Sequence, residues 1–200
     1  ALAVAVGRAR RSAVGTWAFE RGGFVLEAGR GADAARVPPL LFRHPMPAEW
    51  RCVLATPDVP RGLHGRAETE AFRRLAPPPA ARVGAIARLA LLVALPALLE
   101  RDAAAFGRAI TEIQRLVGDA FRPVQGSRFA HPLVARVVRE MDRAGACGVG
   151  QSSWGPACFG LAPDPDTAAR IAERVRARVP GVAVRVVRFQ NRGASVRRVD

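Results

Sequence analysis

The chain has no lysine and no tyrosine, and aromatic residues make up only 6% of its 200 residues. Its 31 basic residues are therefore all arginine, and with 17 acidic residues they give a formal net charge of +14. Such a charge points to nucleic acid as a partner, but the arginines are scattered and few rings are available to stack on bases. The composition favours a small anionic partner. An anion- or nucleic-acid-binding module stays open as the non-enzymatic alternative.

Cysteine is also scarce, and the sequence has no long apolar run. Cys52, Cys147 and Cys158 are odd in number and lack CxxC spacing, so neither a disulfide framework nor a zinc site is expected. The longest apolar run, residues 89–99, is shorter than the roughly 20 residues that span a bilayer. It predicts a buried helix that bends or ends near Pro96. With no signal-peptide pattern, the sequence predicts a cytoplasmic protein without a membrane partner.

The first part of the chain, up to about residue 72, is predicted to be rich in strands or loops. Two short apolar runs in residues 16–29 are split by Arg21-Gly22-Gly23, which indicates a hairpin. Residues 51–56 read as a buried strand, and residues 57–65 as a loop rich in proline and glycine. The proline-rich stretch at 76–81 is the predicted boundary between two lobes, residues 1–75 and residues 82–200.

The second part is predicted to be an α+β lobe. Apolar residues recur at helical spacing in 106–117, 134–141 and 171–179, and the last helix is expected to begin at an N-cap, Asp164 or Asp166. Residues 144–147 and 157–161 are predicted to pair as strands. Pro180-Gly181 is expected to end the last helix before a final strand at 182–189. Strands flanked by helices in this order favour an α+β fold.

A glycine-rich stretch, GVGQSSWGP at 148–156, lies between the two paired strands. Its glycines would let backbone N–H groups turn inward and approach a ligand closely. Gln151, Ser152 and Ser153 add short hydrogen-bonding side chains, so the stretch is predicted to form a cradle for an anion, usually a phosphate. The alternative is a glycine-rich hairpin loop with an exposed tryptophan.

Four motifs occur in the same order as in a known family. They are RSAVGTWAFERGGF (11–24), TPDVPRGLHG (56–65), FRPVQGSRFAHP (121–132) and GVGQSSWGP. Together they resemble the β-ribofuranosylaminobenzene 5′-phosphate synthases, a branch of the superfamily named for galactokinase, homoserine kinase, mevalonate kinase and phosphomevalonate kinase (GHMP). The resemblance implies a two-lobed GHMP-kinase-like fold. This chain would supply the end of the N-terminal lobe and a ferredoxin-like α+β C-terminal lobe.

The resemblance also implies a reaction. Members of this branch condense phosphoribosyl pyrophosphate with 4-aminobenzoate or 4-hydroxybenzoate and release pyrophosphate and carbon dioxide. The product begins the biosynthesis of methanopterin coenzymes, which serve one-carbon metabolism. The superfamily also allows an ATP-dependent small-molecule kinase, which is the alternative enzyme reading. Family members carry a further Gly-Leu-Gly-Ser phosphate loop near the N-terminus. This sequence begins beyond that loop, at Ala1, so an enzyme truncated at its N-terminus is expected, and these residues alone are not expected to be active. The resemblance also implies a homodimer.

The reaction requires pyrophosphate to leave while positive charge builds at C1 of the ribose. Positioning and electrostatic stabilisation are therefore expected to dominate catalysis. The leading hypothesis assigns the anion cradle to Gly148, Gly150, Gln151, Ser152, Ser153 and Gly155, with Ser152 also predicted to be catalytic. Trp154 is expected either to pack against the aromatic substrate or to anchor the loop to the core.

Three further polar clusters are candidates for the site. In the first, Asp58 would help hold Mg²⁺ on the pyrophosphate, Arg61 would contact a phosphate or carboxylate, and His64 would donate or accept a proton. A solvated loop is its alternative reading. The second and third clusters are candidate anion contacts, and each has a structural alternative, which for the third is slightly favoured. They comprise Arg122, Gln125, Arg128 and His131, and Arg11, Ser12 and Thr16 beside Gly15.

Overall fold

The computed structural model describes residues 9, 12–29 and 36–195. The chain divides into two compact units, one made of Ala1–Ala48 and Phe189–Asp200 and the other of Glu49–Arg188. This division differs from the predicted lobes. Strand β3 (Arg51–Pro57), which the sequence placed in the N-terminal lobe, pairs with β5 and β6 near the other end of the chain. Hydrogen-bond partners distant in sequence, and not the proline-rich stretch at 76–81, decide where β3 belongs.

The first unit contains helix α2 (Val14–Arg21) and an antiparallel strand pair, β1 (Phe24–Glu27) with β2 (Leu40–His44). The hairpin predicted over residues 16–29 is wrong, because its first apolar run forms α2. Gly22 and Gly23 both have positive φ angles, of 65° and 74°, and they turn the chain from the helix into β1. A short apolar run fits either a helix or a strand, and here the helix is the one that forms.

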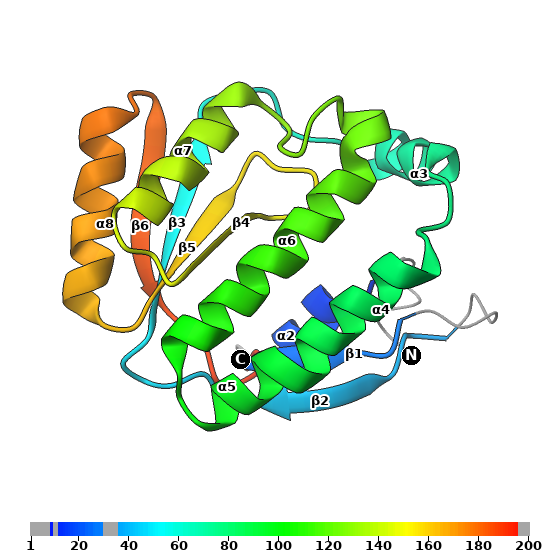
Figure 1. Cartoon of the computed structure of the whole chain (residues 1–200), viewed down its shortest axis with the longest axis horizontal. Coiled ribbons are helices and arrows are strands. Elements are labelled where there is room, and N and C mark those ends of the chain that lie inside the picture. The colour runs from blue at the N-terminus through cyan, green and yellow to red at the C-terminus, as the bar shows by residue number, and fades with distance from the viewer. Residues whose placement is uncertain (1–8, 10–11, 30–35, 196–200) are drawn as a thin grey trace, which may run out of the picture. The chain divides into compact units, whose positions relative to one another are not determined.

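The second unit is built on a four-stranded antiparallel sheet in the order β4-β5-β3-β6 (Figure 1). The strands are β4 (Gly148–Gln151), β5 (Cys158–Ala162), β3 and β6 (Val182–Arg188). Helices α7 (Pro132–Arg143) and α8 (Pro165–Arg178) cover one face of the sheet. The predicted α+β class is confirmed, as are the helices that the apolar spacing predicted and the strands at 51–56 and 182–189.

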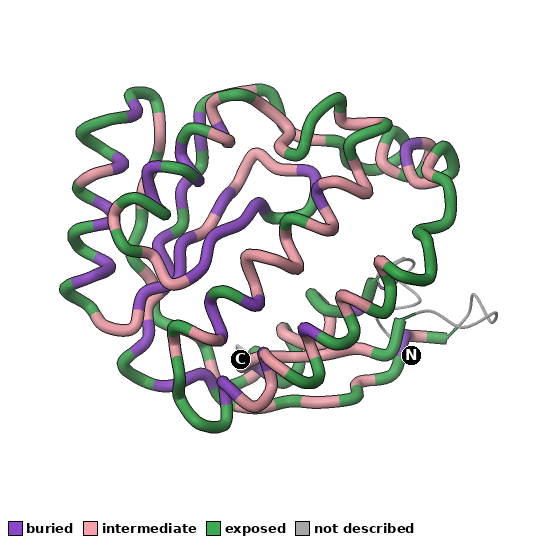
Figure 2. Tube along the Cα trace, viewed as in Figure 1, coloured by how far each residue is buried: buried purple, intermediate pink, exposed green. Residues whose placement is uncertain are grey.

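The main core lies between this face and the two helices. Buried residues from the sheet and from both helices meet there, and Figure 2 shows them along β3, β5 and α8. Fully buried members include Val53, Val137, Met141, Ile171 and Val175. Asp164 caps α8 as expected, because its Oδ1 accepts a hydrogen bond from the Thr167 backbone N–H at 2.6 Å.

Helix α6 (Ala103–Gln125) runs along β4 on the side away from this core. Alternate residues of β4 point in opposite directions. Val149 belongs to the core beneath α7 and α8, whereas Gly148 and Gly150 face α6. Thr111 of α6 accepts a hydrogen bond from the Val149 backbone N–H at 2.9 Å, which satisfies part of this exposed sheet edge.

Between β3 and α6 the chain forms helices α3 (Gly65–Arg74), α4 (Ala80–Leu89), a π-helical turn η1 (Ala90–Ala94) and α5 (Leu95–Leu99). The sequence did not predict α3. The π-helical turn ends at Ala94, and Pro96, which has no N–H to donate, follows in the first turn of α5.

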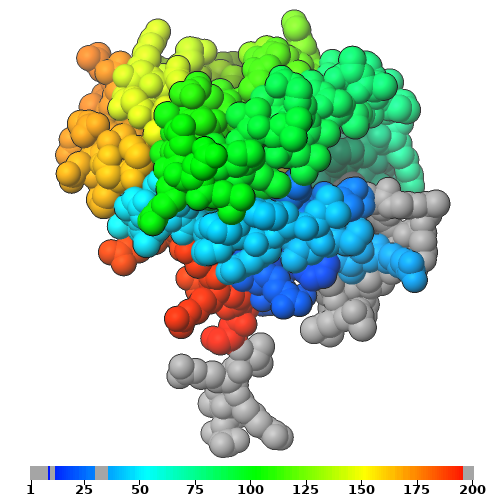
Figure 3. Space-filling model, turned by 60° about the horizontal axis from the view of Figure 1, so that its bottom comes forward, coloured from blue at the N-terminus to red at the C-terminus, as the bar shows by residue number. Residues whose placement is uncertain are grey.

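The helical stretch Ala80–Leu99 is 20 residues long and apolar enough to cross a membrane by length and composition. A core helix of a soluble protein can meet the same test, so this is weak evidence for a span. The prediction of a buried helix is only partly right. Leu98 is fully buried, but Leu91 and Leu92 are 48% and 71% exposed, and this stretch forms part of the surface in Figure 3.

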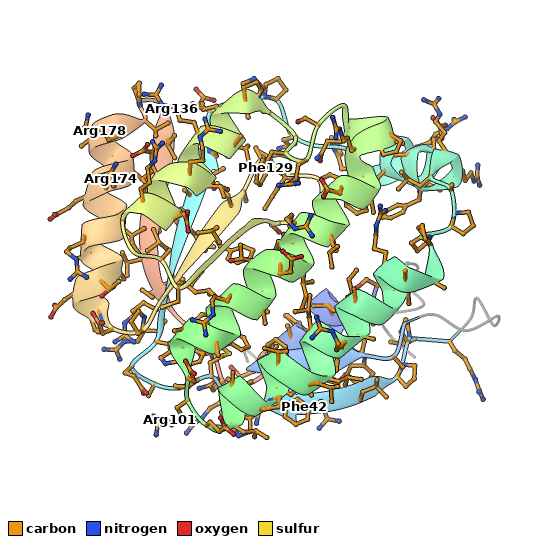
Figure 4. All side chains as sticks on the ribbon, in the orientation of Figure 1. Phe42, Arg101, Phe129, Arg136, Arg174 and Arg178 are labelled. Carbon is orange, nitrogen blue, oxygen red and sulfur yellow. The ribbon has the colours of Figure 1, made fainter. Side chains whose placement is uncertain are left out.

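An ionic brace joins α7 to α8. The buried Glu140 carboxylate accepts hydrogen bonds from Arg143 at 3.0 Å and from Arg174 at 2.8 Å. Nearby, the Arg136 guanidinium donates to the Arg178 carbonyl oxygen at 2.7 Å. Figure 4 shows Arg136, Arg174 and Arg178 together on these two helices.

Candidate functional site

The predicted glycine-rich loop is in fact a strand followed by a tight turn. Residues 148–151 form β4, which pairs with β5 in the register Gly148↔Leu161 and Gly150↔Phe159. The first paired strand is therefore not 144–147, which instead connects α7 to β4 and contains Gly145 with a φ of 92°. Only residues 152–157 turn between the strands.

Gly148 and Gly150 serve close packing of β4 against α6. A side chain at Gly148 would collide with the backbone of Gly107 in α6, and one at Gly150 would lie 2.5 Å from the Gln114 side chain. Both glycines are buried. The absent side chains let β4 approach α6, which gives both glycines a structural reason, and their role in anion binding stays a prediction.

Gln151 is also structural in this arrangement. Its side chain is 6% exposed, and its Oε1 accepts a hydrogen bond from the Ala130 N–H at 2.8 Å. Its Nε2 donates to Gln125 Oε1 at 3.1 Å and to the Ser153 carbonyl oxygen at 2.8 Å. Gln151 thus ties the end of β4 to the segment that connects α6 with α7.

The turn that follows keeps the features of an anion site. Ser152 and Ser153 are exposed, and their hydroxyls point to no acceptor among the described residues. The Ser152 and Gly155 N–H groups bond within the turn, to Ala157 O and Ser152 O, whereas the N–H groups of Ser153 and Trp154 have no acceptor in the described part of the chain. Ser153 has a φ of 49°, a conformation uncommon outside glycine and often found at functional sites.

Trp154 is anchored in the molecule. It is 2% exposed, stacks on Phe121 with ring centroids 4.2 Å apart and an interplanar angle of 9°, and meets Phe72 edge-on at 5.4 Å. Phe72 and Phe121 also meet edge-on, at 5.8 Å. The alternative of an exposed tryptophan is wrong. Between the two roles predicted for Trp154, the structure shows the anchoring contact.

The loop between β3 and α3 lies against this turn. A side chain at Gly62 would collide with the Trp154 carbonyl, so the two backbones touch. Asp58 directly follows β3 at the same end of the sheet, because Ala55 pairs with Cys158. Asp58, Arg61 and His64 are all exposed, and His64 Nδ1 lies 3.0 Å from the Gly62 carbonyl oxygen.

The segment between α6 and α7 completes the same end of the sheet. Arg128 is already engaged, since its guanidinium donates to both oxygens of Asp119 at 2.9 and 3.1 Å. The Asp119 pKa is lowered, first by this hydrogen bond and also by the charges of Arg128, Arg115 and Arg122. His131 caps α7 by accepting from the Leu133 N–H at 3.1 Å. These contacts make Arg128 and His131 structural in this arrangement.

Arg122 differs from Arg128. It is exposed on α6 next to Phe121, and it makes no hydrogen bond or ion pair with another described residue. Arg61 is likewise exposed and makes no hydrogen bond or ion pair with another described residue. Both guanidinium groups are therefore available for a ligand.

The third polar cluster, predicted beside Gly15, belongs to the other unit. Arg11 lies outside the described residues. Ser12 is exposed, and its hydroxyl accepts from the Val14 N–H at 3.2 Å. Gly15 and Thr16 lie inside helix α2 and not in the turn that the sequence indicated.

The glycine-rich stretch and two of the three further clusters thus meet at one end of the sheet. We call this the sheet-end site and define it as loop 58–64, turn 152–156 and segment 121–131. Sequence reasoning gave no role to Phe72, Phe121 or Gly62. Phe121 stood within a quoted motif, but its contact with Trp154 depends on the fold, and Phe72 carried no local signal.

The sheet-end site offers little to a metal ion by itself. No group of three or more His, Cys, Asp or Glu side chains suited to a metal is found among residues 9, 12–29 and 36–195. Asp58 is the single acidic side chain in loop 58–64, and Asp119 is held by arginines. One carboxylate fits Mg²⁺ only where the substrate phosphates and water supply the other ligands.

Comparison with known proteins identifies the fold. Residues 94–181 match the family described as GHMP kinases C terminal. The solved mevalonate diphosphate decarboxylase of Staphylococcus aureus superposes with a TM-score of 0.61 at 15% identity, covering 86% of this chain and 53% of that one. At this identity the likeness concerns the fold alone.

Curated relatives are closer in sequence. The beta-ribofuranosylphenol 5′-phosphate synthase of Methanothermobacter thermautotrophicus is 34% identical over 96% of this chain and 60% of its own length. The protein of the same name from Archaeoglobus fulgidus is 29% identical over 80% of this chain and 51% of its own length. The chain thus spans between half and 60% of these relatives. Residues 94–181 are thus similar to the C-terminal domain of the GHMP kinases, and most of the chain is similar in sequence to the beta-ribofuranosylphenol 5′-phosphate synthases.

Proposed function

We propose that the protein acts as a decarboxylating phosphoribosyltransferase. It would condense phosphoribosyl pyrophosphate with 4-hydroxybenzoate, or alternatively 4-aminobenzoate, in the biosynthesis of methanopterin coenzymes. The name of its curated relatives supports 4-hydroxybenzoate, since attack by that acceptor yields a ribosylphenol. The observation that carries the proposal is the sheet-end site, whose three segments carry guanidinium groups without a described partner, backbone N–H groups and serine hydroxyls around an aromatic cluster.

The bond changes balance without an oxidant or reductant. The C1–O bond of the ribose breaks, and pyrophosphate leaves with the electron pair. The ring carbon that bears the carboxylate then attacks C1. Loss of carbon dioxide returns the electron pair of its C–C bond to the ring and restores aromaticity. The protein must therefore bind several phosphate charges, stabilise the leaving group and orient the arene.

The described residues can divide these tasks. Ser152, Ser153 and the N–H groups of Ser153 and Trp154 would receive one phosphate group, and Arg61 and Arg122 would contact others bidentately. Asp58 would hold Mg²⁺ together with pyrophosphate oxygens, where the ion would neutralise charge on the leaving group. His64 would accept the proton of the phenolic hydroxyl as the ring attacks and would return it to the oxygen once carbon dioxide has left. Gly148 and Gly150 are left out, because they lie in β4.

We place the enzyme in the cytoplasm, because a substrate with several phosphate charges does not cross a bilayer unaided. A homodimer is the proposed oligomeric state, and light scattering on the purified protein would measure it. Neither property changes the assignment of residues within one chain.

The decisive experiment uses the full-length gene product, expressed from its own start codon. It is incubated with Mg²⁺, phosphoribosyl pyrophosphate and carboxyl-labelled 4-hydroxybenzoate or 4-aminobenzoate, and released carbon dioxide is counted. Release that depends on both substrates is expected. No release with either benzoate would contradict the proposal. ATP consumption, or RNA binding that disappears with added salt, would then favour the kinase or the nucleic-acid-binding alternative.

A pair of variants tests the sheet-end site in the same assay. Ser152→Ala is expected to lower kcat/KM by about tenfold or more, because a phosphate contact is lost, and to leave the melting temperature unchanged because Ser152 is exposed. Ser195→Ala, which removes an exposed serine hydroxyl from the other unit, is the matched comparison. Equal turnover in wild type and Ser152→Ala would remove turn 152–156 from the site.

A further inference from the structure

The indole N–H of Trp154 is the most unusual polar group in the described part of the chain. Trp154 is 2% exposed, and its Nε1 has no hydrogen-bond partner among the described residues. Buried indole N–H groups usually find an acceptor, since leaving one unpaired destabilises the folded state. A donor of this kind at a candidate site is available for a ligand atom.

The surroundings of this donor suit an aromatic ligand. Phe121 stacks on Trp154 at 4.2 Å, and Phe72 meets both rings edge-on. Ser152 and Ser153 precede Trp154 in sequence, and Arg122 follows Phe121. Arg61 precedes Gly62, whose backbone touches that of Trp154. The cluster therefore combines ring surfaces, one unpaired donor and nearby cationic groups for phosphates.

Phe72 is the ring in this cluster that comes from a mostly exposed helix. It comes from α3, a helix in which Ala71 is the one buried residue. Phe72 itself is half-buried and touches the stacked pair only edge-on. Phe121, in contrast, belongs to the long helix α6, which is packed along β4.

We propose that the arene acceptor binds against Trp154 in the place of the Phe72 ring, and that its para oxygen accepts a hydrogen bond from Trp154 Nε1. This rests on the proposed function and assigns Trp154 as the residue that selects a phenol over an arylamine. A phenolic oxygen accepts a hydrogen bond readily. The nitrogen of an arylamine accepts poorly, because its lone pair is delocalised into the ring.

The opposite orientation of the arene, in which the protein binds its carboxylate, fits the reaction less well. An arginine or N–H bound to the carboxylate would stabilise the negative charge that must be lost as carbon dioxide. Binding the para oxygen leaves the carboxylate free of such stabilisation, and the arginines remain available for the phosphates.

The test compares the two benzoates in the full-length gene product. Trp154→Phe keeps an aromatic ring and removes the N–H. It is expected to reduce the ratio of kcat/KM for 4-hydroxybenzoate to that for 4-aminobenzoate by about tenfold, with KM for phosphoribosyl pyrophosphate unchanged. Trp50→Phe is the control, because Trp50 is equally buried, at 4% exposed, and contacts Phe106 outside this cluster. An unchanged ratio in Trp154→Phe would overturn the proposal while leaving the proposed function intact.

A second variant covers the case in which Trp154→Phe does not fold. Phe72→Leu shortens the ring that the acceptor is proposed to displace. It is expected to tighten binding of 4-hydroxybenzoate several-fold in equilibrium dialysis, since less protein must move aside. Unchanged or weaker binding would overturn the proposal.

Binding also separates this proposal from the proposed function. If wild-type protein releases no carbon dioxide, dialysis with 4-hydroxybenzoate and with benzoate still measures the para contact. Tighter binding of 4-hydroxybenzoate that is lost in Trp154→Phe would support the contact without the reaction. Equal binding of the two compounds would overturn it.

Discussion

At the scale of single residues, the glycines of GVGQSSWGP illustrate how the same residue type serves different purposes. Gly155 has a φ of 70° and belongs to the turn, as glycine-rich loops require. Gly148 instead lies in β4, where its missing side chain makes room for the backbone of Gly107. The cradle reading assumed one purpose for all three glycines of the motif.

This difference yields a prediction about stability. Gly148→Ala is expected to lower the free energy of unfolding by about 1–3 kcal/mol, because its new Cβ meets the backbone of Gly107, which cannot rotate away. Urea denaturation measures it. Gly84→Ala in α4 is the matched control. Nothing lies within 4 Å of its added Cβ, so it should be neutral or stabilise by up to about 1 kcal/mol. A Gly148→Ala variant of full stability but lost activity would restore the cradle reading.

At the scale of elements, α7 and α8 depend on both apolar packing and the Glu140 brace. Burial alone would raise the Glu140 pKa, but hydrogen bonds from Arg143 and Arg174 outweigh it and lower the pKa. A carboxyl whose pKa is lower in the folded state stabilises that state above its ordinary pKa. The stabilisation is lost as the pH falls through the folded-state value.

The brace can therefore be tested through pH. Glu140→Gln is expected to lower the free energy of unfolding by about 1–2 kcal/mol at pH 7, a modest figure because both arginines are partly exposed. The difference from wild type should shrink as the pH falls below 4.5, the ordinary value for glutamate, and through the lower folded-state pKa of Glu140. Glu173→Gln removes an exposed carboxylate from α8 and is the control. A difference that stays constant with pH would contradict the role of the charge.

The apolar stretch Ala80–Leu99 shows the limit of reasoning from one element. Its hydropathy predicted burial, yet the structure buries Leu98 and leaves Leu92 mostly exposed. Hydropathy indicates which residues of a helix favour burial. Whether they are buried depends on neighbouring elements from other parts of the chain.

At the scale of the whole molecule, the three cysteines report on the integrity of the sheet. Burial raises the pKa of the Cys52 and Cys158 thiols to about 12, and burial also raises the pKa of Cys147. Cys52 lies in β3 and Cys158 in β5, the paired strands at the middle of the sheet. These thiols gain reactivity only when the sheet opens.

We therefore expect a thiol reagent such as dithiobis(nitrobenzoate) at pH 8 to leave Cys52 and Cys158 unmodified in the native protein. Thiolate is the reactive form, and both raised pKa values and burial suppress it. Only slow labelling of the half-buried Cys147 is expected, and denaturant should release all three thiols together. Rapid native labelling of Cys52 or Cys158, located by mass spectrometry, would show that the β3–β5 pair opens on its own.

The sequence by itself determined the elements whose signals are local. Apolar spacing predicted α6, α7 and α8, because a helix buries one stripe of its own residues, and Asp164 marked the start of α8 through its cap. The four ordered motifs indicated the superfamily, and the polar residue types marked the loops that meet at the sheet-end site.

Only the tertiary structure decided contacts between residues distant in the chain. It placed β3 with β5 and β6, put Gly148 and Gly150 against α6, and committed Arg128 to Asp119 while leaving Arg122 free. It also brought Phe72 and Phe121 onto Trp154 and left the indole N–H without a partner. Such contacts depend on sheet register and on helix packing, and no spacing within a short segment encodes either.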